Sequence, residues 1–158
     1  MPYCLSVAGY SGTPLAQKLG IAAGATLALL AAPPGWAIDL PPGVVVKHRA
    51  GGHADVVVAF LTSAGALESR LDALGAMIFP AGGLWIAWPK KASGVATDLG
   101  DNAVRAAALP RGLVDNKVCA LDATWSALRL VWRRENRVGA AKASRPVKGR
   151  SQRDQRRG

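Results

Sequence analysis

The segment that most restricts the fold of this chain is residues 82–94, which read GGLWIAWPKKASG. The five residues LWIAW are apolar at every position, which is typical of a strand buried on both faces of a sheet. Pro89 ends this strand because proline cannot donate a ladder hydrogen bond. A loop with two lysines follows, and Thr97 with Asp98 can then cap a helix. A buried strand that runs into a cationic loop and a helix start is the place where open α/β sheets bind ligands.

The rest of the chain alternates short strands with helices. Apolar, β-branched runs bounded by glycine and proline predict strands, and apolar residues at helical spacing predict an amphipathic helix. The expected strands are 25–30, 44–47, 56–60, 84–88, 113–121 and 125–133, and the expected main helices are 64–78 and about 98–108. A short first helix is expected with Thr13 as its N-cap, Pro14 at its first position and Gly20 just past its end.

This alternation implies a parallel sheet with right-handed crossovers. The tight turn at residues 122–124 joins the last two strands and predicts a hairpin. We therefore predict an α/β fold: a three-layer Rossmann-like sandwich with a mostly parallel sheet of about six strands and a C-terminal antiparallel hairpin.

The positive charge is concentrated at one end of the sequence. The 158 residues carry a formal net charge of +10, and residues 133–158 hold ten lysines and arginines against two acids. That segment has almost no large apolar residues, which is typical of disorder. We expect one folded domain at residues 1–134 and a basic, disordered tail at residues 135–158.

Cysteine use and hydropathy favour a cytoplasmic location. Cys4 and Cys119 are far apart and lack metal-ligand spacing, so no disulfide framework is indicated. The apolar run that follows Lys18 is interrupted by glycines and is too short to span a bilayer. No membrane association is expected.

The carboxyl ends of parallel strands share one edge of a sheet. That edge should bring together residues 31–36, 60–63, 89–94 and 122–126, together with the start of the first helix. Lysines beside helix N-termini can bind an anion. The candidate ligand-binding residues are Tyr10, Ser11, Thr13, Trp36, Lys90, Lys91, Ser93, Thr97, Asp122, Thr124 and Trp125.

Each candidate also has an ordinary structural role open to it. The two lysines can be solvated loop charges, the hydroxyl residues can be helix caps, the tryptophans can be packing residues, and Asp122 can stabilise a turn. His48 and His53 have no Cys or acid at convincing metal spacing, so no metal site is expected. The sequence shows no complete catalytic set, and no cofactor is assigned.

The order of elements, with a GGLW strand and a terminal hairpin, resembles a reduced class I S-adenosylmethionine-dependent methyltransferase. That family has a Gly-x-Gly-x-Gly loop after its first strand and an acid after its second. Here those places read AAPPGW at residues 31–36 and KHR at residues 47–49. Both departures oppose binding of adenosylmethionine, so the resemblance implies the fold and not the function.

A second resemblance covers more of the sequence. Residues 9–20 (GYSGTPLAQKLG), 54–60 (ADVVVAF), 82–99 (GGLWIAWPKKASGVATDL) and 112–134 (GLVDNKVCALDATWSALRLVWRR) resemble a family of small bacterial proteins, common in actinobacteria, that is classed as a domain of unknown function. The resemblance implies a stand-alone cytoplasmic domain and offers no activity to carry over to this chain.

Three functions remain open from the sequence. The first is a Rossmann-like module without catalysis that binds a small anionic ligand or a protein partner at the sheet edge. The second is a degenerate methyltransferase-like enzyme. The third is association with nucleic acid through the basic tail, which offers charge but no aromatic stacking groups.

Overall fold

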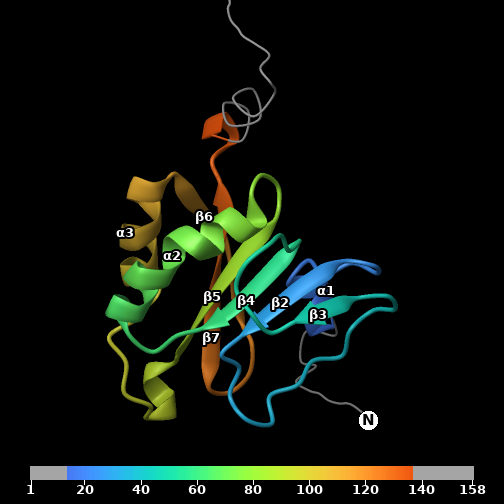
Figure 1. Ribbon diagram of the computed structural model, residues 1–158. Helices are drawn as coiled ribbons and strands as arrows, with labels where there is room; N and C mark the ends of the chain where they lie inside the picture. The colour runs from blue at the N-terminus through green and yellow to red at the C-terminus, as the bar shows by residue number, and fades with distance from the viewer. Residues whose placement is uncertain (1–13, 137–158) are drawn as a thin grey trace, which may run out of the picture.

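The computed structural model describes residues 14–136, which form a six-stranded sheet flanked by helices (Figure 1). The strand order is β3-β2-β4-β5-β7-β6. The strands are β2 (Thr26–Leu30), β3 (Val45–Lys47), β4 (Val56–Phe60), β5 (Gly83–Pro89), β6 (Leu113–Ala120) and β7 (Trp125–Trp132). The predicted mixed α/β sheet of six strands is therefore confirmed.

Strand direction also follows the prediction. The pairs β2–β3, β2–β4 and β4–β5 are parallel, whereas β5–β7 and β6–β7 are antiparallel. Because β3 lies on one side of β2 and β4 lies on the other, the chain reverses its direction of travel across the sheet between β2 and β4. Such a reversal is a topological switch point, and open α/β sheets bind ligands outside the carboxyl ends of the strands there.

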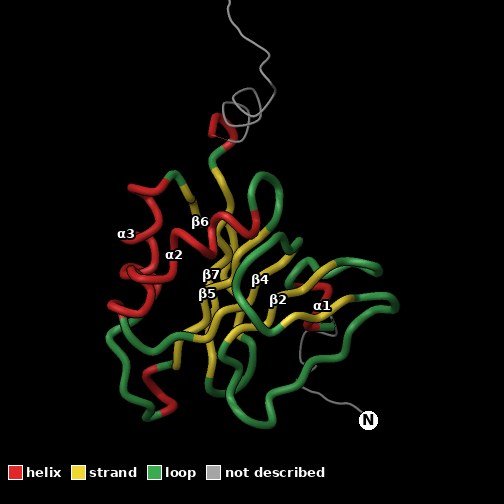
Figure 2. The backbone as a smooth tube through the Cα atoms, in the orientation of Figure 1, coloured by secondary structure: helices red, strands yellow, loops and turns green. Residues whose placement is uncertain are grey.

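One face of the sheet is covered by α2 (Ala64–Ile78) and α3 (Asp101–Ala108), which lie side by side in Figures 1 and 2. Helix α2 turns its leucines toward the sheet at helical spacing, and these pack with Trp88 and Leu128. A short 3-10 turn, η2 (Leu109–Arg111), connects α3 to β6. This packing explains why every residue of β5 is buried, since the other face is covered as well.

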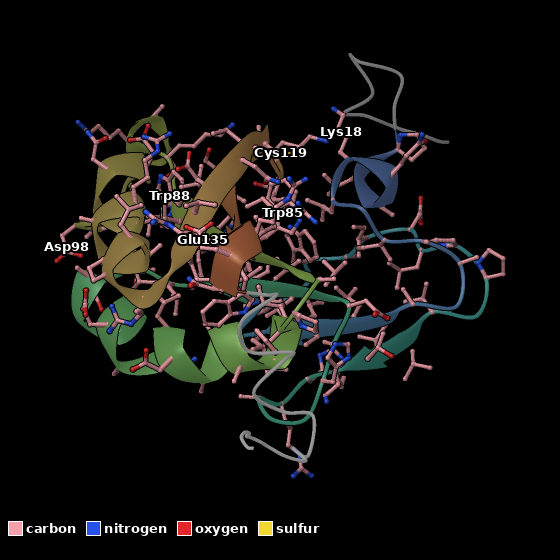
Figure 3. The ribbon with its side chains drawn as sticks, turned by 90° about the horizontal axis from the view of Figure 1, so that it is seen from above. Lys18, Trp85, Trp88, Asp98, Cys119 and Glu135 are labelled. Atoms are coloured by element: carbon pink, nitrogen blue, oxygen red, sulfur yellow. The ribbon has the colours of Figure 1, made fainter. Side chains whose placement is uncertain are left out.

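The opposite face is covered by a thinner layer. Its helix α1 (Leu15–Lys18) has a single turn, and the segment after β2 adds further partly buried apolar side chains. Trp85 lies on this face and donates from Nε1 to the carbonyl of Leu19 at 3.0 Å. Figure 3 shows Trp85 toward Lys18 and α1, with Trp88 on the side of α3. The two tryptophans of β5 thus serve two different cores, as alternation along a strand requires.

Two helix starts differ from the sequence prediction. Pro14 is the N-cap of α1 instead of its first helical residue, because its backbone is extended (ψ 143°). Helix α3 begins at Asp101, with Gly100 as its N-cap, and not near Asp98. Thr97 and Asp98 do not start α3, because their side chains bond to the region where β4 leads into α2.

The described structure continues to Asn136, whose Nδ2 donates to the carbonyl of Gly112 at 3.2 Å. Residues 1–13 and 137–158 lie outside the described residues, so the disordered tail stays a prediction. Within residues 14–136, no helix has the length and apolar character needed to cross a bilayer.

Candidate ligand-binding rim

The carboxyl ends of β2, β4 and β5 lie at one edge of the sheet because these strands are parallel. The turn between β6 and β7 joins this edge, since Pro89 at the end of β5 pairs with Trp125 at the start of β7. We call this edge the rim: residues 31–36, 60–63, 89–94 and 122–126. The four segments that the sequence placed together are therefore neighbours.

Three aromatic side chains link three of these segments. The ring of Phe60 lies 5.0 Å from the ring of Trp36 and 5.0 Å from that of Trp125, both in edge-to-face geometry. Phe60 is the last residue of β4 and is only 4% exposed, whereas both tryptophans are partly exposed. Edge-to-face pairs at this distance are favourable beyond the area that they bury. A buried phenylalanine therefore holds two partly exposed indoles at the switch point.

Lys90 is bonded within the rim. Its Nζ donates to the carbonyl of Asp122 at 2.9 Å, and its backbone N–H donates to the carbonyl of Thr124 at 2.7 Å. Both bonds join the loop after β5 to the hairpin turn. The side chain of Lys90 thus links two rim segments.

Asp122 organises the hairpin turn. Its Oδ1 accepts hydrogen bonds from the backbone N–H groups of Thr124 at 2.8 Å and of Trp125 at 2.7 Å. An aspartate that bonds to the backbone two residues ahead is a common device of tight turns. Asp122 therefore fixes the position of the Trp125 backbone.

The cationic loop forms the 3-10 turn η1 (Lys91–Ser93). Ser93 closes this turn, since its Oγ donates to the carbonyl of Lys90 at 2.6 Å and accepts from the N–H of Val95 at 3.2 Å. Lys91 is exposed, and its side chain makes no hydrogen bond or ion pair with any other residue in 14–136. Of the two lysines, Lys91 is the one that a ligand can reach without breaking an internal bond.

The N-terminus of α2 is already occupied by the protein's own groups. Ser63 Oγ accepts from the N–H of Ala66, and Asp98 Oδ1 accepts from the N–H of Ala64 at 2.7 Å. Thr97 fixes Asp98 in place by donating from Oγ1 to the carbonyl of Thr62 at 2.7 Å. The carboxylate sits where the helix dipole would attract an external anion, so this helix start offers little to a ligand.

The turn after β2 holds a residue in an unusual backbone conformation. Ala31 directly follows the strand and has φ 59°, and it is the non-glycine residue with positive φ among those described. An L-residue in this left-handed region costs roughly 1–2 kcal/mol relative to its preferred conformations. Such strain clusters at functional sites, and here it lies at the switch point.

The structure does not describe every candidate. Tyr10, Ser11 and Thr13 lie outside the described residues. His48 Nδ1 lies 3.3 Å from the carbonyl oxygen of Leu29, and within residues 14–136 no three His, Cys, Asp or Glu residues gather closely enough to hold a metal ion. The sequence placed Phe60 and Ala31 in the rim segments but did not mark either as a candidate binding residue. The position of Phe60 at the end of a buried strand was the available signal.

No family model matches this sequence, and no curated protein matches it. The resemblance to the domain of unknown function therefore stays a prediction.

Several solved structures are similar to this chain. Magnesium protoporphyrin IX methyltransferase from Synechocystis PCC 6803, with bound SAM, is 14% identical with a TM-score of 0.43, covering 59% of this chain and 47% of its own. A putative methyltransferase from Thermoplasma acidophilum is 8% identical with a TM-score of 0.44, covering 72% and 70%. LepI in complex with SAM is 10% identical with a TM-score of 0.49, covering 75% and 39%. These are likenesses of fold alone, and the chain spans about half the length of the Synechocystis enzyme.

Proposed function

We propose that this chain is a binding module whose rim takes a small anionic ligand that also carries a flat ring. The observation that supports this most directly is the cluster of Trp36, Phe60 and Trp125 at the switch point. Ligand sites in open α/β sheets lie at this position, and they are lined by aromatic and apolar groups with few polar anchors. The two partly exposed indoles supply flat apolar surface for a ring.

The charge of the proposed ligand is assigned from Lys91. This side chain is exposed in the loop that follows Pro89, the register partner of Trp125. The pairing of Pro89 with Trp125 brings this loop to the hairpin turn, so Lys91 adds a positive charge to the rim, which attracts an anionic ligand. Lys90 contributes indirectly, since its bond to the carbonyl of Asp122 keeps the hairpin turn against the loop.

A methyltransferase-like enzyme is the alternative for the same rim. The strand order and the switch point between β2 and β4 favour it. Against it, the loop after β2 reads AAPPGW, and Lys47 and His48 stand where the family has an acid. An anion-binding module needs neither the family's glycine loop nor its acid. A protein partner at the rim is a further alternative, which the aromatic surface also suits.

The experiment compares two ring-bearing probes, adenosine 5′-monophosphate and S-adenosylmethionine, by calorimetry and by tryptophan fluorescence. The proposal expects the monophosphate to bind and to raise the melting temperature, since a ligand that binds only the folded state stabilises it. Lys91→Gln and Trp36→Leu should each weaken binding about tenfold, a loss of roughly 1.4 kcal/mol. The matched control is Arg70→Gln, which removes an exposed cation from α2, outside the rim segments.

The outcomes separate the three possibilities. Monophosphate binding that is unchanged in Lys91→Gln and Trp36→Leu would overturn the rim as its site. Tight binding of S-adenosylmethionine, with none of the monophosphate, would replace the module by the enzyme. A protein that co-purifies with the wild type and is lost in Trp36→Leu would replace the small ligand by a partner.

Two further expectations from the sequence stay proposals. Nucleic-acid association through the basic tail, residues 135–158, predicts binding with a steep salt dependence, which deletion of the residues after Arg134 removes. A cytoplasmic location follows from the absence of a cysteine framework in the sequence, and fractionation of cells that express the chain tests it.

A further inference from the structure

Two cations lie side by side on the α1 face of the hairpin, away from the rim. Arg129 of β7 pairs with Trp85 of β5 on one side and with Lys117 of β6 on the other. Directly paired residues point to the same face of a sheet, and Trp85 places that face on the side of α1. The sheet therefore carries a Lys117–Arg129–Trp85 row.

The guanidinium of Arg129 lies against the backbone of Gly83. A Cβ atom at Gly83 would be 2.5 Å from Nε and 2.8 Å from Nη2 of Arg129. Gly83 is the first residue of β5, and the rim lies beyond the last, Pro89. The glycine thus gives the guanidinium room to lie across the sheet at the end opposite the rim.

Arg129 and Lys117 have no acidic partner in the described structure. Arg129 is partly buried and makes no hydrogen bond or ion pair with residues 14–136. Lys117 donates from Nζ to the carbonyl of Lys18 at 3.1 Å. Eight carboxylates of the described structure are bonded to other groups and not to these two cations. The pairs are Asp55 with the N–H of Thr26, Glu68 and Asp72 with Arg111, Asp98 with the N–H of Ala64, Asp101 and Asp115 with Arg105, Asp122 with the backbone of its turn, and Glu135 with Arg133.

The remaining sequence offers little to neutralise these cations. Residues 1–13 contain no Asp or Glu, and residues 137–158 contain Asp154 alone. Like charges directly opposite on one sheet face destabilise the fold, and burial lowers the pKa of Arg129 by penalising its charged form. Arginine nevertheless stays protonated at neutral pH. A partly buried guanidinium beside a lysine therefore lacks a counter-charge.

We propose that Arg129 and Lys117 form a second anion site, on the α1 face, that takes the phosphate or carboxylate group of a small molecule. Guanidinium presents a planar fork of donors that fits both groups, and lysine adds a point charge. Lys18 lies next to Lys117, because its backbone carbonyl accepts the hydrogen bond from Lys117 Nζ. Figure 3 shows Lys18 beside Cys119. The site is independent of the rim in its residues and in its end of the sheet.

The test titrates the full chain with inorganic phosphate and, in a second arm, with succinate at 150 mM salt. The readouts are the Nε–H resonance of Arg129 and the melting temperature. We expect a saturable shift of this resonance, and at least a tenfold loss of affinity in both Arg129→Gln and Lys117→Gln. Arg70→Gln, on an exposed position of α2, removes the same charge on the opposite face and should leave the affinity unchanged.

A second signature separates an anion site from mere packing. Without anion, Arg129→Gln should melt at or above the wild-type temperature because it removes an unpaired charge, and it should lose the gain that phosphate gives the wild type. The proposal would be overturned if the Nε–H resonance of Arg129 did not shift on adding phosphate. It would also be overturned if phosphate raised the melting temperature equally in Arg129→Gln and Arg70→Gln. Should Arg129→Gln fail to fold, Lys117→Gln decides, because Lys117 is exposed. The arm that binds more tightly identifies phosphate or carboxylate as the group, and failure here leaves the Lys91 result at the rim unaffected.

Discussion

The carboxylate of Asp98 accepts a hydrogen bond from the backbone N–H of Ala64 at 2.7 Å, across 34 positions of sequence. Ala64 is the first residue of α2, so a side chain from the loop before α3 caps a different helix. The bond joins the start of α2 to the segment that follows the cationic loop of the rim. It couples the stability of a main helix to the conformation of the candidate site.

Asp98→Ala should destabilise the protein by about 1 kcal/mol, because loss of a helix cap costs on this order. Urea unfolding measures this, and hydrogen exchange at Ala64 should accelerate. Asp39→Ala is the control, since it removes an exposed carboxylate that makes no hydrogen bond or ion pair with the other described residues. Equal midpoints for the two variants would contradict the capping role.

Ala31→Gly should stabilise the protein by roughly 0.5–1 kcal/mol. Glycine adopts the left-handed conformation without the cost that a Cβ atom brings, and the extra entropy of the unfolded chain offsets only part of that gain. Ala37→Gly, in the same loop, has no positive φ to relieve and should lose stability. Thermal unfolding of both variants decides, and a lower melting temperature for Ala31→Gly would remove the case for strain.

Gly83→Ala should displace the Arg129 guanidinium, because its Cβ would meet Nε and Nη2 of that side chain. The far end of an arginine can move, so the loss of stability should stay below the roughly 1–3 kcal/mol that overpacking against fixed atoms costs. The loss should shrink in the Arg129→Ala background, which a double-mutant cycle measures. Gly65→Ala is the matched control: it lies in α2 with open space around the added Cβ, and it should stabilise the protein by up to about 1 kcal/mol. No coupling between positions 83 and 129 would mean that they do not touch.

Trp85→Phe should cost about 1–3 kcal/mol, since it leaves the buried carbonyl of Leu19 without its donor. Trp132→Phe removes a similar bond to the carbonyl of Gly75 in α2. Hydrogen exchange separates the two: the first variant should loosen residues 19–21, and the second should loosen α2. Identical exchange patterns would show that neither bond acts locally.

Cys119 predicts a loss of stability in alkali. Burial raises the pKa of its thiol, while Lys18 and Lys117 oppose this. The unfolded thiol, which ionises near pH 8.5, therefore gives up its proton at lower pH than the folded one. The contribution is full below that pH and is lost as the pH rises toward the folded-state pKa. The test compares the free energy of unfolding of Cys4→Ser with that of Cys4→Ser/Cys119→Ala. The excess stability of the variant that keeps Cys119 should shrink between pH 7 and pH 10, and a constant difference would contradict the prediction.

The sequence alone determined the strands, the long helix and their order. Strand β4 and helix α2 begin and end at the predicted residues, because runs of β-branched residues and leucines at helical spacing act locally. The parallel core with its terminal hairpin followed from that order and from the limits on crossover connections. Residues 31–36, 60–63, 89–94 and 122–126 came together for the same reason.

Only the tertiary structure decided what the polar side chains do. Thr97 and Asp98 carry the local signal of a helix start, yet the fold brings them to the start of α2. There Asp98 bonds to the N–H of Ala64, which has no partner within its own helix, and Thr97 bonds to the carbonyl of Thr62. Lys90 and Lys91 are alike in sequence, but one reaches the carbonyl of Asp122 and the other makes no bond within residues 14–136. Hydrogen bonds depend on distances of about 3 Å between segments far apart in sequence, and those distances are set by packing.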